Sequence, residues 1–402
     1  MAGGTVGRGA RILGLFAAMM LVAATGRAED MIVEKKSFDL PSLETIGGKT
    51  VKNVKVGYET YGVLNAEKSN AILVAHFFSG TSHAAGKYAA TDKLPGYWDD
   101  LIGPGKAVDT TKYFVIASDT LVNLNTGDPK VTTTGPATID AATGKPYGMS
   151  FPLVTIGDFV RVQKALVDSF GITKLHAVMG ASMGGLQTYE WAATYPDMVL
   201  RAIPVIAAPE PSPWLIAWLN VWAAPITVDQ NWNGGDYYGK TPPTAGLAQS
   251  LKVISLHANH WNWADKNFGL ALADEAKPPL GAMGNRFKIE AALEASGAAR
   301  AALSDANHLL YLVKANQTFI PGSGAGAKTA EEGLKRIKAK MLVLYSPTDQ
   351  VFTADHVRSG VARLKANGVS VDTGEIEGPF GHLNGVLAMK PQSARISEFL
   401  AK

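Results

Sequence analysis

Short apolar runs alternate along this chain with stretches that suit a helix. The runs cover residues 52–61, 71–77, 113–118, 175–179, 202–207, 341–345 and 371–376, and the helical stretches include 156–170, 187–195 and 354–366. Nearly continuous apolar runs are typical of strands that are covered on both faces. Their alternation with helices predicts an α/β fold with a mostly parallel, doubly wound sheet. With 402 residues, 47% of them hydrophobic, the chain is long enough to bury the core of such a sheet.

One long segment, residues 211–328, interrupts the alternation. It contains much Ala and Leu, few runs of strand length, and six of the eight tryptophans. Trp214, Trp218 and Trp222 are each four residues apart, so they share one face of a helix. This face packs inside a helical insertion, forms an apolar wall over a binding site, or does both. We predict that the segment is a helical lid, which divides one core into residues 29–210 and 329–402.

The first 28 residues have the three-part pattern of a secretory signal peptide. Arg8 and Arg11 precede a short apolar stretch, and Gly26 and Ala28 place small side chains at the cleavage positions. The apolar stretch, residues 12–24, is shorter than a membrane span needs. A buried N-terminal helix is the alternative. We predict cleavage after Ala28 and a periplasmic or secreted protein.

Charge and cysteine content exclude several classes of protein. Three of the 38 basic residues and none of the 35 acidic residues lie in positions 1–28, so the remaining chain has equal numbers of both. A net charge of zero gives no reason to expect nucleic acid or an anionic membrane as a partner. The chain has no Cys, which excludes disulfides, thiol catalysis and thiolate metal sites.

A glycine-rich motif follows the fourth apolar run. Gly180-Ala-Ser182-Met-Gly184-Gly lies between residues 175–179 and a stretch that suits a helix. This is the context of a nucleophile elbow, a sharp turn from strand to helix that needs glycine two residues on either side of the serine. The turn exposes the serine hydroxyl beside a helix N-terminus, where negative charge is favoured. The motif predicts Ser182 as a nucleophile.

A serine nucleophile needs a base and an acid that orients the base. His382 follows the last apolar run, and Asp349 follows the run at 341–345. Both positions are at carboxyl ends of predicted strands, where catalytic groups of open α/β sheets gather, and the order Ser, Asp, His is the one that the elbow fold uses. Asp349 as a helix N-cap and His382 as a solvated loop residue are the alternatives. Other candidates for the acid are Asp305, Asp355 and Asp372.

Acyl chemistry also needs donors for an oxyanion. We predict the backbone N–H groups of Met183, which follows the nucleophile, and of Phe78, in the loop after the run at 71–75. His76 and His83 flank this loop, but their spacing is not that of metal ligands, so we expect them to structure the loop. We predict neither a metal nor a cofactor.

Stretches within and outside these motifs resemble the homoserine O-acetyltransferase family of α/β hydrolases, over nearly all of residues 40–390. They include Asn70–His76, Ser79–His83, Leu101–Lys106, Gly144–Gly148, Gly180–Gly185 and Trp232–Tyr237. The resemblance implies the α/β-hydrolase fold, a triad of Ser182, Asp349 and His382, a helical lid, and a homodimer that forms through this lid.

The chain departs from the family at positions that hold the amino acid substrate. Leu383 stands where the family has an Asp for the homoserine amine, and Ala223 stands where it has an Arg for the carboxylate. Leu256-His257 replaces a Tyr-Arg pair. A site without charge partners does not offset the desolvation of a zwitterion. We therefore predict a pocket for an uncharged group, lined by Leu383 and by Trp214, Trp218 and Trp222.

Together these features predict an exported serine hydrolase with a small-molecule acyl substrate, which cleaves an ester, lactone or amide through an acyl-enzyme on Ser182. The alternative is an O-acyltransferase of the homoserine O-acetyltransferase type with an acyl-CoA donor, because both reactions share the acyl-enzyme. A non-catalytic binding protein on the same scaffold is a third hypothesis. The presence of all three triad candidates is evidence against it.

Overall fold

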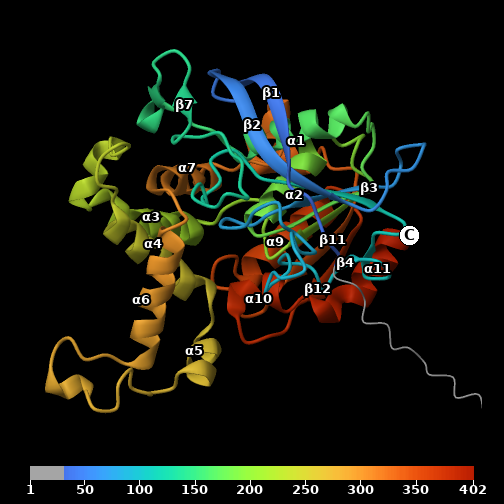
Figure 1. Cartoon of the computed structure of the whole chain (residues 1–402). Helices are drawn as coiled ribbons and strands as arrows, with labels where there is room; N and C mark the ends of the chain where they lie inside the picture. Colours follow the sequence, from blue (N-terminus) through green and yellow to red (C-terminus); the bar gives the residue numbers. More distant parts are fainter. Residues whose placement is uncertain (1–30) are drawn as a thin grey trace, which may run out of the picture. The chain divides into compact units, whose positions relative to one another are not determined.

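The computed structural model describes residues 31–402, so the predicted signal peptide lies outside the described residues. An eight-stranded sheet forms the centre of the described chain (Figure 1), in the order β1-β2-β6-β3-β9-β10-β11-β12. β1 and β2 are antiparallel to each other, and β2 is antiparallel to β6; the other neighbours are parallel. The strands are β1 (Lys36–Glu44), β2 (Thr50–Tyr61), β3 (Ala71–Ala75), β6 (Phe114–Ser118), β9 (Ala177–Ala181), β10 (Arg201–Val205), β11 (Lys340–Tyr345) and β12 (Val371–Glu375).

Eleven α-helices accompany the sheet in the described chain. They are α1 (Ile156–Ser169), α2 (Met183–Thr194), α3 (Pro213–Thr227), α4 (Thr244–Ala258), α5 (Trp261–Asn267), α6 (Lys288–Ala301), α7 (Ala306–Gln317), α8 (Ala330–Leu334), α9 (Ala354–Ala366), α10 (Asn384–Leu387) and α11 (Ser393–Ala401). Among the described residues, none of the helices is both long enough and apolar enough to cross a membrane.

The central strands are buried on both faces, as their sequence predicts. Every residue of β3, β6 and β9 is buried. Because successive side chains of a strand point to opposite faces, Leu73 belongs to one apolar core, and its neighbours Ile72 and Val74 belong to the other. Helices α1 and α2 cover the first core, and α11 contributes Ile396 and Phe399 to the second. The sheet is therefore wound on both faces, as in the α/β-hydrolase fold.

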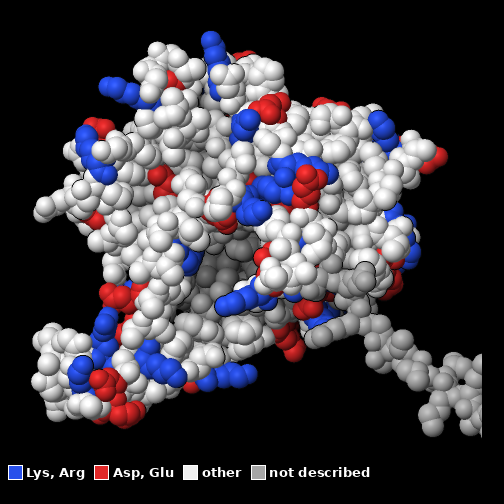
Figure 2. Space-filling view, in the orientation of Figure 1, with Lys and Arg blue, Asp and Glu red and all other residues white. Residues whose placement is uncertain are grey.

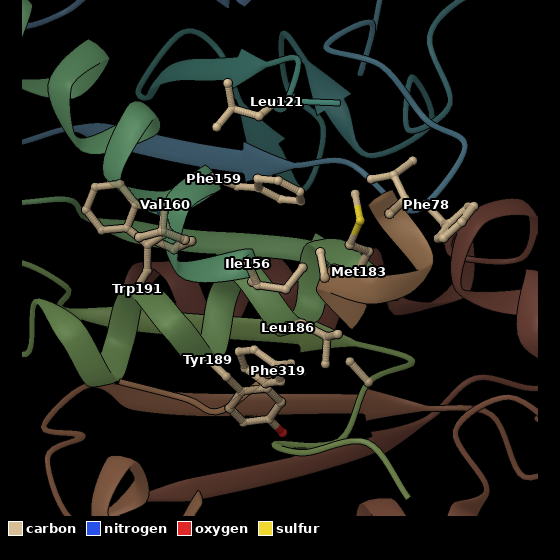
Figure 3. Packing of buried hydrophobic residues seen from close by; sticks show 14 of the residues in the cluster. Phe78, Leu121, Ile156, Phe159, Val160, Met183, Leu186, Tyr189, Trp191 and Phe319 are labelled. Carbon is tan, nitrogen blue, oxygen red and sulfur yellow. The ribbon is translucent and has the colours of Figure 1, made fainter. Parts of the chain in front are cut away.

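The first core ends beside the elbow. Figure 3 shows Ile156 and Phe159 of α1 close to Met183 and Leu186 of α2, with Phe78 at the far end of the cluster. Met183 follows Ser182 directly, so the packing that anchors α2 also positions the nucleophile. The first turn of α2 is therefore part of the main hydrophobic core.

Five helices, α3 to α7, lie between β10 and β11, within the segment that we predicted as a lid. We call them the lid helices. α4 packs against both α3 and α6, and α3 also packs against α7. Figure 1 shows α3, α4 and α6 to one side of the sheet, so they can border a site at the ends of its strands.

The strands and helices differ from the predicted ones at a few ends. β9 begins and ends two residues later than predicted, and α2 begins at Met183 instead of residue 187. Gly184 and Gly185 have a low intrinsic helix propensity, but close packing of α2 against the sheet outweighs it. β1 was not predicted, since this edge strand is largely exposed and lacks a continuous apolar run.

Candidate active site

Ser182 lies in the turn between β9 and α2. Its φ is 57° and its ψ is −118°, a strained conformation for a residue with a side chain. Its backbone N–H donates to the carbonyl oxygen of Val205, 2.8 Å away. A Cβ atom on Gly184 would overlap the carbonyl oxygen of Ala75, and one on Gly180 would overlap the carbonyl oxygen of Gly184. The structure therefore shows why this turn needs glycine on both sides of the serine.

The structure brings the three triad candidates into one hydrogen-bonded chain. His382 Nε2 lies 2.8 Å from Ser182 Oγ, and His382 Nδ1 lies 2.8 Å from Asp349 Oδ2. All three side chains are buried. The carboxylate accepts a hydrogen bond, so Nδ1 carries the proton and Nε2 is free to accept from the serine hydroxyl. This is the arrangement that a serine nucleophile and its base require.

Backbone contacts hold the acid, and an amide side chain joins the two loops. Asp349 Oδ1 accepts from the N–H groups of Val351 and Phe352, at 2.7 and 3.0 Å. Asn384, two residues after His382, donates to Ser346 Oγ at 3.0 Å. Since Ser346 is three residues before Asp349, this bond fixes the loop of the base against the loop of the acid. The sequence motifs did not point to Asn384.

The other candidates for the acid lie away from His382. Asp355 is exposed and forms an ion pair with Arg358, and Asp372 is exposed on β12. Asp305 caps the N-terminus of α7 and accepts from the N–H of His308.

The predicted oxyanion donors border the nucleophile. Met183 is the first residue of α2, and Phe78 lines the same cavity as Ser182. Within residues 31–402, neither backbone N–H donates a hydrogen bond to another residue. Both groups are therefore available to an oxyanion.

A cavity of about 230 Å³ opens over Ser182 and His382. Most of its wall is apolar, with Phe78, Trp222 and Ile254 among the lining residues. Leu383 lines it as predicted, and no Asp or Glu does. Figure 2 shows a hollow between the lid helices and the core, with basic side chains at its border.

Only one of the three predicted tryptophans lines this cavity, which corrects our expectation for the other two. Trp222 is buried there, whereas Trp218 stacks on His257 with ring centroids 4.1 Å apart. Trp214 is 53% exposed, and its Nε1 donates to the carbonyl oxygen of Gln350. Residues four apart on a helix are rotated by roughly 40° and displaced by roughly 6 Å. The stripe therefore turns away from the cavity within two turns.

The structure adds a charged residue that the sequence analysis missed. Arg300, near the end of α6, lines the cavity. Its Nη1 donates to Ser255 Oγ at 2.8 Å and to the carbonyl oxygen of Leu251 at 3.3 Å. In the sequence it is one Arg in an Ala-rich helix, a pattern typical of a solvated position, so no local signal would have identified it.

His76 and His83 flank the loop that contains Phe78, and their contacts hold this loop in place, as expected. His76 is buried, and its Nε2 accepts from the N–H of Thr120 at 3.1 Å. Burial lowers the pKa of His76, so it stays neutral at pH 7. His83 Nδ1 lies 3.0 Å from Glu59 Oε2. Over the described part of the chain, no group of three or more His, Asp or Glu is placed to hold a metal ion.

The fold and this arrangement of nucleophile, base and acid define an enzyme of the α/β-hydrolase fold, and a family profile described as "alpha/beta hydrolase fold" matches residues 94–382. Homoserine O-acetyltransferases of Methanohalobium evestigatum and Deferribacter desulfuricans are each 40% identical to the chain. The alignments cover 92% and 88% of this chain, and 73% and 92% of those proteins. The chain therefore belongs to the homoserine O-acetyltransferase family.

Solved structures of two activities resemble this chain closely. Esterase E22 is 46% identical, with a TM-score of 0.87 and coverage of 92% of this chain and 100% of that one. The homoserine O-acetyltransferase from Bacillus anthracis is 36% identical, also with a TM-score of 0.87, and the match covers 92% of this chain and 98% of that one. The protein is thus an acetyltransferase or an esterase.

Proposed function

We propose that this protein is a serine esterase that hydrolyses small acyl esters, and lactones or amides of similar size, through an acyl-enzyme on Ser182. The observation that carries the proposal is the cavity over Ser182, which is mostly apolar and has no acidic residue in its wall. Leu383 lines this cavity beside His382, at the position where the family resemblance implies an Asp for the amine of homoserine. The identity to esterase E22 also supports hydrolysis.

The contacts account for each step of such a reaction. As Ser182 Oγ attacks the acyl carbonyl, His382 Nε2 takes the hydroxyl proton across 2.8 Å and then gives it to the departing alcohol. Asp349 stabilises the imidazolium that forms in between. The N–H groups of Met183 and Phe78 are available for the oxyanion. Water then attacks the acyl-enzyme, with His382 again as the base, and releases the acid.

Acyl transfer to homoserine from an acyl-CoA donor is the second candidate. The names of the relatives from M. evestigatum and D. desulfuricans favour it more directly than they favour hydrolysis. It uses the same acyl-enzyme on Ser182, but the acyl donor is a thioester of CoA and the acceptor is homoserine instead of water. The chemistry of the cavity favours the first candidate, because the ammonium of homoserine would lose water without gaining a carboxylate.

The two candidates can be separated with purified protein. We expect release of 4-nitrophenol from 4-nitrophenyl acetate, and an added acetyl group on Ser182 in intact-mass and peptide spectra after brief exposure. Ser182→Ala should abolish both signals and retain the fold, since only a hydroxyl is removed. The same samples receive acetyl-CoA and homoserine, and CoA release is followed. Transfer to homoserine faster than ester hydrolysis would establish the second candidate instead.

We further propose that the protein is exported, as the pattern of residues 1–28 predicts. Export supports hydrolysis, because an acyl-CoA donor is a cytoplasmic compound. Fractionation of a bacterial host, followed by N-terminal sequencing of the recovered protein, tests the proposal. A chain that begins at Met1 in the cytoplasm would contradict it and would favour acyl transfer.

A further inference from the structure

Arg300 lies in the wall of the catalytic cavity and is positively charged. It has no acidic partner among the described residues. Within residues 31–402, no carboxylate lies within ion-pair distance of it, and no Asp or Glu lines the cavity. Its side chain is half-buried, and this partial removal from water lowers its pKa. An arginine nevertheless remains charged at neutral pH. The apolar wall over Ser182 therefore contains one uncompensated positive charge.

The protein holds this guanidinium by one nitrogen only. Nη1 donates to Ser255 Oγ and to the carbonyl oxygen of Leu251, both on α4. Among the described residues, Nε and Nη2 have no acceptor. Ser255 lines the cavity beside Arg300, so the anchored side of the guanidinium lies at the wall. The remaining N–H groups are thus available for a ligand that enters the cavity.

A cation that is partly removed from water is unfavourable unless an anion or several acceptors compensate it. A planar guanidinium with free N–H groups fits a carboxylate, which accepts two parallel hydrogen bonds. An ammonium group has the opposite requirement, and no acidic residue in the wall meets it. The cavity therefore offers a partner to a substrate with one negative charge, but only half of the partners that a zwitterion needs.

We propose that Arg300 binds a carboxylate of the substrate, so that this site prefers mono-anionic esters to neutral and to zwitterionic ones. The proposal deepens the esterase function proposed above and rests on it. The carboxylate can belong to the alcohol or to the acyl part of the ester, and both have the same chemistry toward Arg300. This site is distinct from the charged positions that the family resemblance implies, which are here Ala223, His257 and Leu383.

A matched set of acetyl esters tests the preference. Hydrolysis of 4-acetoxybutanoate, of its neutral methyl ester and of zwitterionic O-acetylhomoserine is followed by acetate release. Monomethyl glutarate and dimethyl glutarate form a second pair, in which the carboxylate is on the acyl side. We expect the native enzyme to have the highest kcat/KM for the anionic member of at least one set. A preference for the neutral ester in both sets would overturn the proposal.

Substitution of Arg300 shows whether this residue causes the preference. Loss of a charge-assisted pair of hydrogen bonds corresponds to roughly 10- to 100-fold in affinity. Arg300→Met should therefore lower the ratio of anionic to neutral kcat/KM by about this factor, and Arg300→Lys should restore part of it. The control is Arg286→Met, which removes an exposed arginine near the other end of α6 that pairs with Glu294. An unchanged ratio in Arg300→Met would overturn the proposal.

A binding measurement separates this proposal from the esterase function. In the Ser182→Ala background, calorimetry with 4-acetoxybutanoate should show binding that weakens by the same factor when Arg300→Met is added. If binding depends on Arg300 but the native enzyme hydrolyses no ester, the esterase function is contradicted and the carboxylate site at Arg300 is not. If the enzyme hydrolyses esters, but neither binding nor the ratio of anionic to neutral kcat/KM depends on Arg300, only the role assigned to Arg300 is contradicted.

Discussion

At the scale of single residues, the site depends on which hydrogen-bond partner each polar atom has. Asp349 divides its two oxygens between His382 and the backbone N–H groups of Val351 and Phe352. One oxygen therefore orients the base, and the other holds the loop. A substitution that keeps an oxygen for the loop but removes the charge can separate these two roles.

Asp349→Asn is such a substitution. We expect turnover of 4-nitrophenyl acetate to fall by about 10³- to 10⁴-fold, because the amide does not stabilise the imidazolium and favours the wrong tautomer of His382. Asp355→Asn is the control, since that carboxylate is exposed and paired with Arg358. Stopped-flow or steady-state assays at one pH give both values. A larger loss in Asp355→Asn than in Asp349→Asn would show that the acid is wrongly assigned.

His257 of α4 lies under Trp218 and is buried, and burial lowers its pKa to about 4. An unfolded histidine takes up its proton near pH 6.5. Between these values the unfolded state binds more protons, so the free energy of unfolding falls as the pH is lowered from 6.5 toward 4.

His257→Phe keeps an aromatic ring against Trp218 and removes this proton uptake. We expect urea unfolding between pH 7 and pH 4.5 to show a smaller loss of stability in the variant than in the native protein. Some loss should remain, because burial also lowers the pKa values of His76, His176 and His308. An identical pH dependence for both proteins would contradict the prediction.

At the scale of elements, the geometry of the elbow depends on a direct backbone contact between α2 and β3. The missing side chain of Gly184 lets α2 begin directly against Ala75 at the end of β3. That contact places the helix N-terminus, and with it the N–H of Met183, beside the nucleophile. The strand order of the sheet makes the contact possible, since β3 and β9 are parallel neighbours.

Gly184→Ala should therefore reduce stability and activity together. The added methyl would overlap backbone atoms of Ala75, so we expect a loss of about 1–3 kcal/mol in the free energy of unfolding and a displaced oxyanion donor. Gly284→Ala, between α5 and α6, is the matched control, because nothing lies within 4 Å of its Cβ position. Urea unfolding and ester turnover are measured for both. Equal behaviour of the two variants would refute this explanation of the elbow.

At the scale of the whole molecule, α3 presents an apolar surface on its outer side. Trp214 and Val221 lie on one face of α3, and each is more than one third exposed, as is Val228 directly after the helix. Large apolar side chains that are exposed along one face of a helix can form an interaction site. The dimer implied by the family resemblance would cover it.

We therefore expect the protein to form a homodimer through α3. Sedimentation equilibrium should give twice the chain mass for the native protein and a smaller mass for Val221→Glu, because burial of an unpaired carboxylate opposes association. Ser296→Glu, at an exposed position of α6, should leave the mass unchanged. A native protein that stays monomeric at high concentration would exclude this interface.

Local patterns of the sequence determined much of this protein. Apolar runs predicted seven of the eight strands of the main sheet, and α9 begins and ends at the predicted residues. The elbow around Ser182 and the order of Ser182, Asp349 and His382 also follow from consecutive residues and from their places after strands. Such features could be predicted because hydrophobic periodicity and turn geometry depend on neighbours in the chain. Export and the dimer remain predictions.

Tertiary structure alone decided which tryptophan and which charged residue line the pocket. Trp222 faces the cavity and Trp214 does not, although both belong to one stripe, because the packing of α3 selects which part of the helix meets the site. Arg300 reaches the cavity only because α6 packs on α4, where Ser255, 45 positions earlier in the sequence, anchors it. Contacts between such distant residues depend on how helices pack, and no periodicity within either segment encodes them.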